Sequence, residues 1–249
     1  MSDASESPLT ELVPAPGRGR TFEREVVPGL ADVTGSGRVR LDAIARWLQD
    51  VAYADVVDAG LAGRGAWLVR RARLRVERFP GFGEPFSVRT WCSAAGRLAA
   101  ERRTSVWGVS GKVEAVALWI HVDTETLRPL RLGEEFQAFY GESAGDRKAD
   151  FRLRHADPPA NAGRVPWRFR ASDVDVAGHV NNAAYWEPLE ERFLGATEPE
   201  SADVEIEYRD PAQPGDAEVL SSRGAMWVTS PGRAVHASIV GVPDTDPAA

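Results

Sequence analysis

The chain has 249 residues, of which 43% are hydrophobic and 27% charged, so it is long enough for one large or two small globular domains and is not disordered, collagen-like or coiled-coil. Its net charge of −7 argues against nonspecific nucleic-acid binding as the main task. No apolar run is long enough to span a membrane, and the single cysteine, Cys92, excludes an intramolecular disulfide and fits a reducing cytoplasm.

The N-terminal residues 1–20 are rich in Ser, Glu, Pro and Gly and lack the basic and then apolar pattern of a signal peptide. We expect a disordered tail there. Residues 21–27 then read as a short strand, and a glycine-containing segment leads into a helix. Its apolar residues recur at spacings of three and four: Leu41, Ile44, Leu48, Val51 and Ala52.

Four runs with strand-like alternation follow, separated by tight turns. They cover residues 67–79, 84–94, 97–109 and 112–124. In the first run, Leu68, Ala72, Leu74 and Val76 fall on one face, and Arg71, Arg73, Arg75 and Glu77 fall on the other. The sequence therefore predicts a mostly antiparallel sheet with one dry and one wet side.

Between residues 126 and 163 the alternation stops, and a short helix at 133–140 lies in a polar stretch that reads as a linker. The earlier pattern then begins again, with a strand at 165–170 and a helix at 182–193. Pro188 inside that helix predicts a kink. Four further strands are expected near 204–208, 217–223, 226–229 and 234–242.

The second half of the chain repeats the first at a shift of 141 positions, without gaps. The shift places Gly37 on Gly178 and Leu48 on Leu189. We therefore expect two α+β repeats at 21–125 and 164–242, the linker 126–163 between them, and tails at 1–20 and 243–249. The repeats differ in chemistry, because Thr34 becomes Asp175, Arg38 becomes His179 and Arg40 becomes Asn181.

The candidate site is this polar cluster at a strand-to-helix junction, where unpaired N–H groups and the helix dipole favour negative charge. Asp175 could act as a base or nucleophile, and His179 could bind a carbonyl or orient water. The backbone N–H groups of Gly178 and Val180 could stabilise an oxyanion. The alternative is structural, with an aspartate turn, an asparagine helix cap and a core histidine.

Other motifs argue for less. The sequence Gly141-Glu-Ser-Ala-Gly145 matches the nucleophile elbow of serine hydrolases, but polar and helical segments flank it instead of a strand and a packed helix. His121 and His236 have no neighbours at metal-ligand spacing, and Cys92 fits a packing role. We expect neither a metal nor a cofactor.

The residues from Asp173 to Tyr185, with Asp175, Gly178-His179-Val180-Asn181 and Tyr185, resemble the motif of hotdog-fold thioesterases. Together with Arg78–Gly83, Thr90-Trp91 and Glu207–Arg209, they make the region from about Thr21 to Val242 similar to the acyl-acyl-carrier-protein (acyl-ACP) thioesterases. The resemblance implies a tandem hotdog, in which each repeat is a long helix wrapped by a curved antiparallel sheet. It also implies that the N-terminal repeat binds the acyl chain and the C-terminal repeat carries out catalysis.

Carried over by position, the resemblance makes Asp175 the catalytic aspartate and His179 the catalytic histidine. Two positions depart from it: Ala177 stands where the family has an asparagine, and Pro211 stands where it has a glutamate. Asn181 is the candidate to compensate for the first departure and Asp210 for the second.

The leading hypothesis is a cytoplasmic acyl-[acyl-carrier-protein] hydrolase of fatty acid biosynthesis, whose partner is acyl carrier protein with a phosphopantetheine-linked acyl chain. Arg97, Arg102 and Arg103 form a candidate docking patch for this acidic carrier, against the alternative of a solvated strand edge. Acyl-CoA hydrolysis, enoyl-thioester hydration and noncatalytic acyl binding stay open. So does the oligomeric state, with a homodimer among the options.

Overall fold

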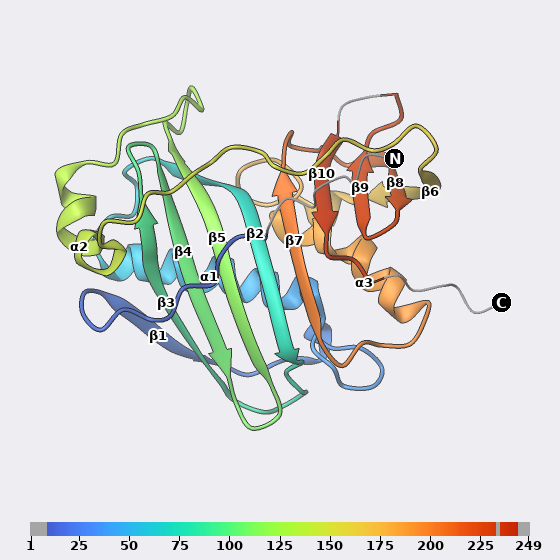
Figure 1. The fold of residues 1–249 in the computed structure, drawn as a ribbon, viewed down its shortest axis with the longest axis horizontal. Coiled ribbons are helices and arrows are strands. Elements are labelled where there is room, and N and C mark those ends of the chain that lie inside the picture. Colours follow the sequence, from blue (N-terminus) through green and yellow to red (C-terminus); the bar gives the residue numbers. More distant parts are fainter. Residues whose placement is uncertain (1–8, 233–234, 244–249) are drawn as a thin grey trace, which may run out of the picture.

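The computed structural model describes residues 9–232 and 235–243, and its described strands form one continuous antiparallel sheet (Figure 1). The order across the sheet is β1-β3-β4-β5-β2-β7-β10-β9-β8-β6. The strands are β1 (Thr21–Val26), β2 (Ala66–Arg78), β3 (Phe86–Ala95), β4 (Ala99–Trp107), β5 (Lys112–Val122), β6 (Gly163–Phe169), β7 (Ala202–Tyr208), β8 (Gly215–Ser222), β9 (Ala225–Thr229) and β10 (Val235–Val240).

This strand order shows the internal repeat directly. Read inward from one edge it runs β1, β3, β4, β5, β2, and read inward from the other it runs β6, β8, β9, β10, β7. Each strand of the first half therefore has a counterpart five strands later in the chain. The halves join where β2 pairs with β7, from Arg71 opposite Glu207 to Val76 opposite Ala202. The predicted doubling of one α+β unit is thus present in the topology.

The helices of the two repeats lie behind the sheet in Figure 1 but differ in length. In the first repeat, α1 (Leu41–Asp58) forms the long amphipathic helix that the apolar spacing predicts. In the second, a 3₁₀ helix (Asn182–Trp186) precedes a short α3 (Glu187–Leu194). The predicted kink at Pro188 is wrong, because this proline lies in the first turn of α3, where a missing N–H costs no helical hydrogen bond.

A third helix, α2 (Glu134–Ala144), lies within the expected linker and packs on β3. It contains Ser143, whose buried hydroxyl donates to the carbonyl of Tyr140. A serine in the last turn of a helix, bonded in this way, has none of the exposure of a nucleophile elbow.

The outer face of the sheet is covered by two chain segments that cross it in front, namely residues 9–13 and 150–157 (Figure 1). The expected N-terminal tail therefore needs correction: Thr10 is buried and its N–H donates to Glu205 at 2.7 Å. Residues 1–8, and residues 244–249 of the expected C-terminal tail, lie outside the described residues. The borders drawn between repeats and linker stay a prediction.

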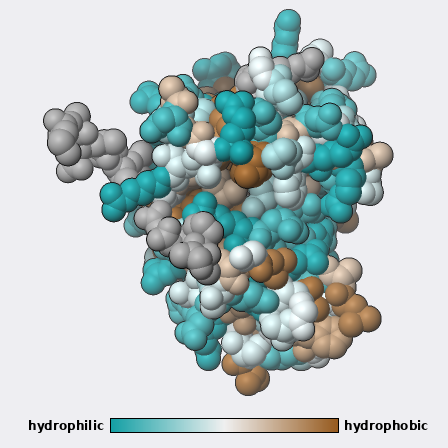
Figure 2. All heavy atoms as spheres, turned by 90° about the vertical axis from the view of Figure 1, so that its right-hand side faces the viewer, coloured by the Kyte–Doolittle hydropathy of each residue, from teal (hydrophilic) through white to brown (hydrophobic). Residues whose placement is uncertain are grey.

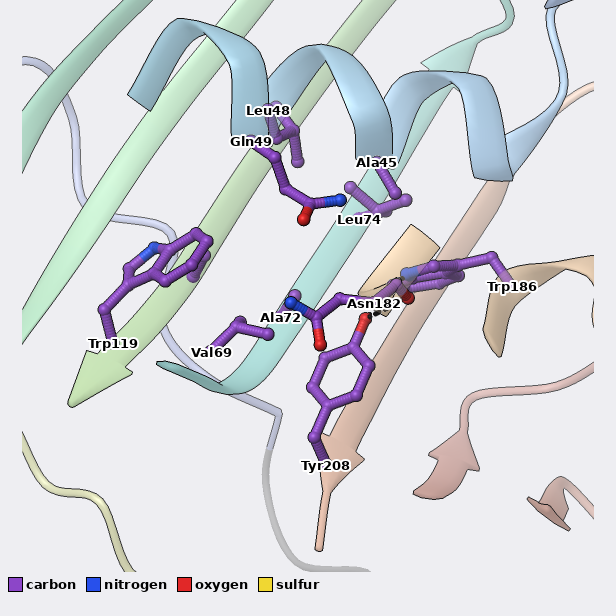
Figure 3. A pocket seen from close by; sticks show the side chains of 11 residues that line it. Ala45, Leu48, Gln49, Val69, Ala72, Leu74, Trp119, Asn182, Trp186 and Tyr208 are labelled. Carbon is purple, nitrogen blue, oxygen red and sulfur yellow. Dashed lines mark hydrogen bonds between the residues drawn. The ribbon is translucent and has the colours of Figure 1, made fainter. Parts of the chain in front are cut away.

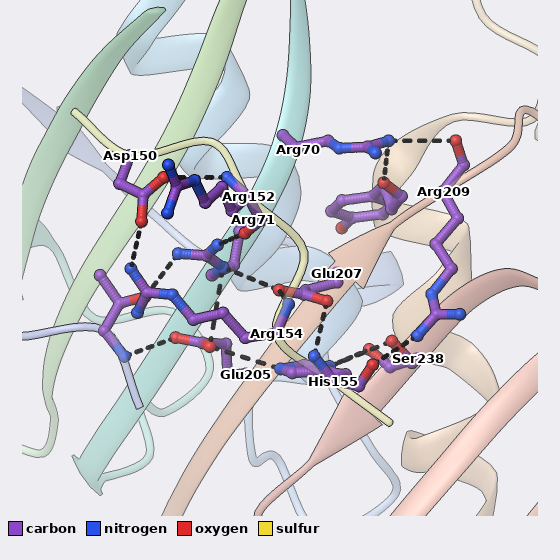
Figure 4. A network of polar contacts seen from close by, with 12 residues as sticks. Arg70, Arg71, Asp150, Arg152, Arg154, His155, Glu205, Glu207, Arg209 and Ser238 are labelled. Atoms are coloured by element: carbon purple, nitrogen blue, oxygen red, sulfur yellow. Dashed lines mark hydrogen bonds and ion pairs between the residues drawn. The ribbon is translucent and has the colours of Figure 1, made fainter. Parts of the chain in front are cut away.

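The face of β2 that we expected to be solvent-exposed is consequently buried in part. Arg71 is buried and pairs with Glu207 at 3.1 Å beneath the crossing segments (Figure 4). On the other side, a register shift between Val69 and Arg71 breaks the alternation, so that Val69 packs on the core and Leu68 is exposed. A β-bulge of this kind inserts one extra residue and changes the direction of the neighbouring side chains.

A single large hydrophobic cluster underlies the sheet and takes residues from both repeats, including Ile44 and Leu74 from the first and Leu189 and Ile206 from the second. The end of the molecule formed by the C-terminal repeat is mostly hydrophilic, with hydrophobic surface broken into separate areas (Figure 2). None of the helices in the described part of the chain is both long and apolar enough to cross a membrane.

Candidate active site

The candidate residues lie on a tight turn that ends just before the 3₁₀ helix of the second repeat. The N–H of Gly178 donates to the carbonyl of Asp175 at 3.0 Å, and the N–H of Asp175 donates to the carbonyl of His179 at 3.0 Å. Gly178 has a backbone φ of +77°, which residues with a Cβ rarely adopt. The turn therefore places Asp175 and His179 at its two ends.

The first repeat contains the same turn 141 residues earlier. The N–H of Gly37 donates to Thr34 at 3.0 Å, the N–H of Thr34 donates to Arg38 at 2.8 Å, and Gly37 has a φ of +86°. The bridge between Val33 and Val39 corresponds to the one between Val174 and Val180. The predicted alignment of the two repeats is confirmed at this turn, so the change from Thr34 to Asp175 is a change of chemistry on one backbone.

The carboxylate of Asp175 is held by two donors. Its Oδ1 accepts from the N–H of Ala177 at 2.8 Å, and its Oδ2 accepts from Nδ2 of Asn181 at 3.0 Å. Asn181 also caps the following helix, since its Oδ1 accepts from the N–H of Ala183 at 2.8 Å. The expected aspartate turn and asparagine cap are thus both present, and they fix the direction in which the carboxylate points.

His179 is half-buried and lines the same cavity as Asp175. Within the described residues, its imidazole has no hydrogen-bond partner. The two side chains are therefore not paired with each other, and each is free to meet a ligand from the cavity.

The cavity has a volume of about 1280 Å³ and is built from both repeats. From the C-terminal repeat, the turn and the residues that follow β7 form one wall. The N-terminal repeat, through α1, β2 and β5, and the following helix α2 provide a largely apolar wall. Its residues include Val56, Leu61, Trp67, Trp119 and Phe136. This volume and lining suit a long apolar ligand whose polar end meets Asp175.

Behind the turn, buried side chains support the 3₁₀ helix (Figure 3). The hydroxyl of Tyr208 donates to the carbonyl of Asn182 at 3.0 Å and accepts from Nε1 of Trp186 at 3.1 Å. Burial raises the pKa of Tyr208 above its ordinary value. Tyr185 accepts from the N–H of Ala212 at 2.9 Å, and burial raises its pKa to about 12. Both phenols are therefore neutral supports.

The expected oxyanion donors need correction. The N–H of Gly178 already closes the turn, and the N–H of Val180 donates to the carbonyl of Ala212 at 3.1 Å. Both groups are thus used for structure. Between Gly178 and Val180, the backbone N–H of His179 is the one that has no hydrogen-bond partner among the described residues.

The expected docking patch also needs correction for two of its three arginines. The side chain of Arg102 is 10% exposed and pairs with Asp55, and that of Arg103 is 3% exposed and pairs with Glu114. The alternation of β4 alone did not show that α1 covers one of them and residues 9–13 cover the other. Arg97 is exposed, and its role in docking stays a prediction.

One site residue was missed from the sequence. Gln49 of α1 reaches the candidate site in the other repeat, where its Nε2 donates to Oδ1 of Asn181 at 3.1 Å. The sequence carries no local signal for this contact, because the two residues are 132 positions apart.

Comparison with known proteins agrees with this architecture. The profile of the acyl-ACP thioesterase N-terminal domain matches residues 19–140, and that of the acyl-ACP thioesterase C-terminal domain matches residues 157–230. An uncharacterized protein of Mycobacterium tuberculosis is 28% identical over 210 residues, which cover 82% of this chain and 83% of that protein. Oleoyl-acyl carrier protein thioesterase 1 of Arabidopsis thaliana is 22% identical, over 67% of this chain and 53% of its own length.

Two solved structures show the fold. An acyl-ACP thioesterase from Bacteroides thetaiotaomicron superposes with a TM-score of 0.72 at 19% identity, covering 89% of this chain and 97% of that one. The 12:0-ACP thioesterase from Umbellularia californica superposes with a TM-score of 0.69 at 20% identity, covering 88% and 92%. The predicted tandem hotdog is confirmed, and with both domain profiles matched in order along most of its length the chain belongs to the acyl-ACP thioesterase family of thioester hydrolases.

Proposed function

We propose that this chain hydrolyses fatty acyl-ACP to free fatty acid and holo-ACP, as a cytoplasmic step of fatty acid biosynthesis. The observation that carries the proposal is the cavity of about 1280 Å³, which joins an apolar wall of the N-terminal repeat to Asp175 and His179 of the C-terminal repeat. An acyl chain would lie along the apolar wall, and its thioester would lie beside the turn.

In the proposed reaction, Asp175 removes a proton from a water molecule whose oxygen attacks the thioester carbonyl carbon. The C–S bond then breaks, and the phosphopantetheine sulfur leaves as a thiol with the proton that Asp175 took from the water. The imidazole of His179 polarises the carbonyl oxygen or positions the water. The backbone N–H of His179, which has no partner among the described residues, is the candidate oxyanion donor in place of those of Gly178 and Val180. The alternative route is attack by Asp175 itself to give an anhydride, which water then cleaves.

The two departures from the family pattern have proposed substitutes in the geometry. Ala177 provides a backbone N–H to Asp175 where the family has an asparagine side chain, and Asn181 provides the amide. Asp210 and Pro211 are both exposed at the wall of the cavity. The carboxylate of Asp210 is therefore available beside the site, as compensation for Pro211 requires.

The test is thiol release from a panel of acyl-ACPs and acyl-CoAs of matched chain length. Asp175→Asn keeps the size of the side chain but cannot accept a proton, so we expect kcat on acyl-ACP to fall by about 100-fold or more. Asp216→Asn removes a charge from an exposed ion pair and serves as the control, with unchanged kcat. Near-full activity of Asp175→Asn would overturn the site assignment.

The same panel separates the alternatives. Faster turnover of acyl-CoA would identify a CoA thioesterase, hydration of crotonyl thioester would identify a hydratase, and retention of acyl thioester without thiol release would identify a binding module. A single turnover in ¹⁸O-labelled water distinguishes the two routes. Through an anhydride, the first product gains an unlabelled oxygen from Asp175, whereas direct attack by water adds a labelled oxygen.

A further inference from the structure

Gln49 contacts the amide of Asn181, whose orientation follows from its hydrogen-bond partners. Oδ1 of Asn181 receives two hydrogen bonds, from Nε2 of Gln49 at 3.1 Å and from the N–H of Ala183 at 2.8 Å. Because a backbone N–H can only donate, the atom that faces it must be the amide oxygen. The amide nitrogen of Asn181 then faces Asp175, to which it donates at 3.0 Å.

A matching contact exists in the opposite direction, from the C-terminal repeat to the N-terminal repeat, and there the helix side chain is an acceptor. Glu190 of α3 lies 141 positions after Gln49 and reaches the turn of the first repeat. Its carboxylate pairs with the guanidinium of Arg38 and accepts from the N–H of Leu41 at 3.0 Å. Arg38 occupies the position that His179 has in the second repeat. Each helix thus supplies one polar side chain to the turn of the opposite repeat.

The residue type at each crossing follows the groups that it meets. Glu190 meets donors, a guanidinium and an N–H, and is an acceptor. Gln49 meets the oxygen of Asn181 and must donate. A glutamate at position 49 would place carboxylate oxygens against that oxygen, a repulsive arrangement that displaces the Asn181 amide.

We propose that Gln49 is a positioning residue for catalysis: by donating to Asn181, it holds in place the amide that directs the carboxylate of Asp175. The N-terminal repeat therefore completes the catalytic turn of the C-terminal repeat in addition to binding the acyl chain. This inference rests on the proposed thioesterase function, of which it names a further part.

The first test compares Gln49→Glu and Gln49→Leu with wild type. We expect kcat to fall by about 10- to 100-fold in both, with KM changed less than about threefold, because the reacting groups are misdirected and the apolar wall is intact. Gln137→Glu makes the same isosteric change on an exposed position of α2 and should leave both constants unchanged. Thermal unfolding verifies that each variant is folded. A kcat within twofold of wild type for both Gln49 variants, or a loss confined to KM, would overturn the proposal.

A double-mutant cycle tests whether Gln49 acts through Asn181. If it does, Gln49→Leu combined with Asn181→Ala should be no slower than Asn181→Ala alone by more than about twofold. Losses that multiply would show that Gln49 acts by another route, against the proposal.

An NMR measurement keeps this inference separate from the proposed function. The side-chain amide signals of Asn181, assigned by their loss in Asn181→Ala, should shift in Gln49→Glu without any substrate present. Unchanged signals would contradict the contact. If the wild-type chain releases thiol from no acyl thioester, the proposed function fails, while the amide signals still report on the contact.

Discussion

Asp55 is the counter-charge for a buried polar cluster near the end of α1. Its carboxylate is 1% exposed and accepts from Nε of Arg20 at 2.7 Å, from Nη1 of Arg102 at 2.5 Å and from the hydroxyl of Tyr140 at 2.9 Å. Burial raises the pKa of Tyr140 to about 12, so this hydroxyl stays protonated as a donor. Arg102 and Tyr140 also line the large cavity, so this cluster forms part of the wall of the proposed acyl site.

Asp55→Ala would leave the guanidinium of Arg102 buried without its counter-charge. We expect the free energy of unfolding to fall by about 3–5 kcal/mol, measured by urea titration. Asp58→Ala is the matched control, because Asp58 also pairs with Arg20 but is 58% exposed, and it should cost less than about 1 kcal/mol. Equal losses in the two variants would show that burial of the pair has no energetic consequence.

At the scale of elements, the segments that cross the outer face of the sheet depend on carboxylates of β7 (Figure 4). Glu207 accepts from the N–H groups of Arg154 and His155 at 2.8 and 3.0 Å, and Glu205 accepts from the N–H of Thr10 at 2.7 Å. Burial alone would raise the pKa of Glu205, but the hydrogen bonds from His155 and Thr10 outweigh it and hold the pKa below its usual value of 4.5.

The depressed pKa gives Glu205 a defined pH dependence. Its stabilising contribution is complete above pH 4.5 and is lost as the pH falls toward the lower pKa of the folded state, because the unfolded chain takes up the proton first. We therefore expect the difference in unfolding free energy between wild type and Glu205→Gln to be largest at pH 7 and to shrink below pH 4.5. Urea titrations over this pH range measure it, and a constant difference would contradict the assignment.

The elements that could be predicted are those with a strong local pattern. Alternation and turn residues indicated the strands, and the apolar spacing of Leu41 to Val51 indicated α1. The second helix was predicted as one continuous element, but the structure has a 3₁₀ helix followed by a short α3. The apolar pattern does not distinguish a 3₁₀ turn from an α-turn. Arg71 is covered by Thr10 and Arg152, which lie in two segments far apart in the chain, and such coverage has no local signature in the sequence.

The same limit applies to the candidate site. Asp175, His179 and Asn181 stood out because the repeat comparison showed polar groups that the first copy lacks. Gln49 could not be placed at the site, since its contact joins α1 to a turn 132 positions later. Side-chain direction across the sheet was equally hidden, and for that reason the buried Arg102 was predicted to face solvent.

At the scale of the whole molecule, the two repeats share one sheet and one core. Arg73 of β2 bonds Asp203 of β7 through both Nε and Nη2 at 2.7 Å, next to the backbone pairing of these strands. We therefore expect urea unfolding to be a single cooperative transition, with coincident midpoints by far-UV circular dichroism and tryptophan fluorescence. Two separated transitions would show that the repeats unfold independently in spite of their joint.

The turn of the N-terminal repeat is closed by side chains of both repeats. The side chain of Arg38 is 9% exposed and pairs there with Glu190 and with Glu198, whereas His179 at the matching position lines the cavity. We therefore expect the doubled chain to bind one acyl ligand. A non-hydrolysable acyl thioester should saturate the protein at one molecule per chain, although the backbone presents the same turn twice.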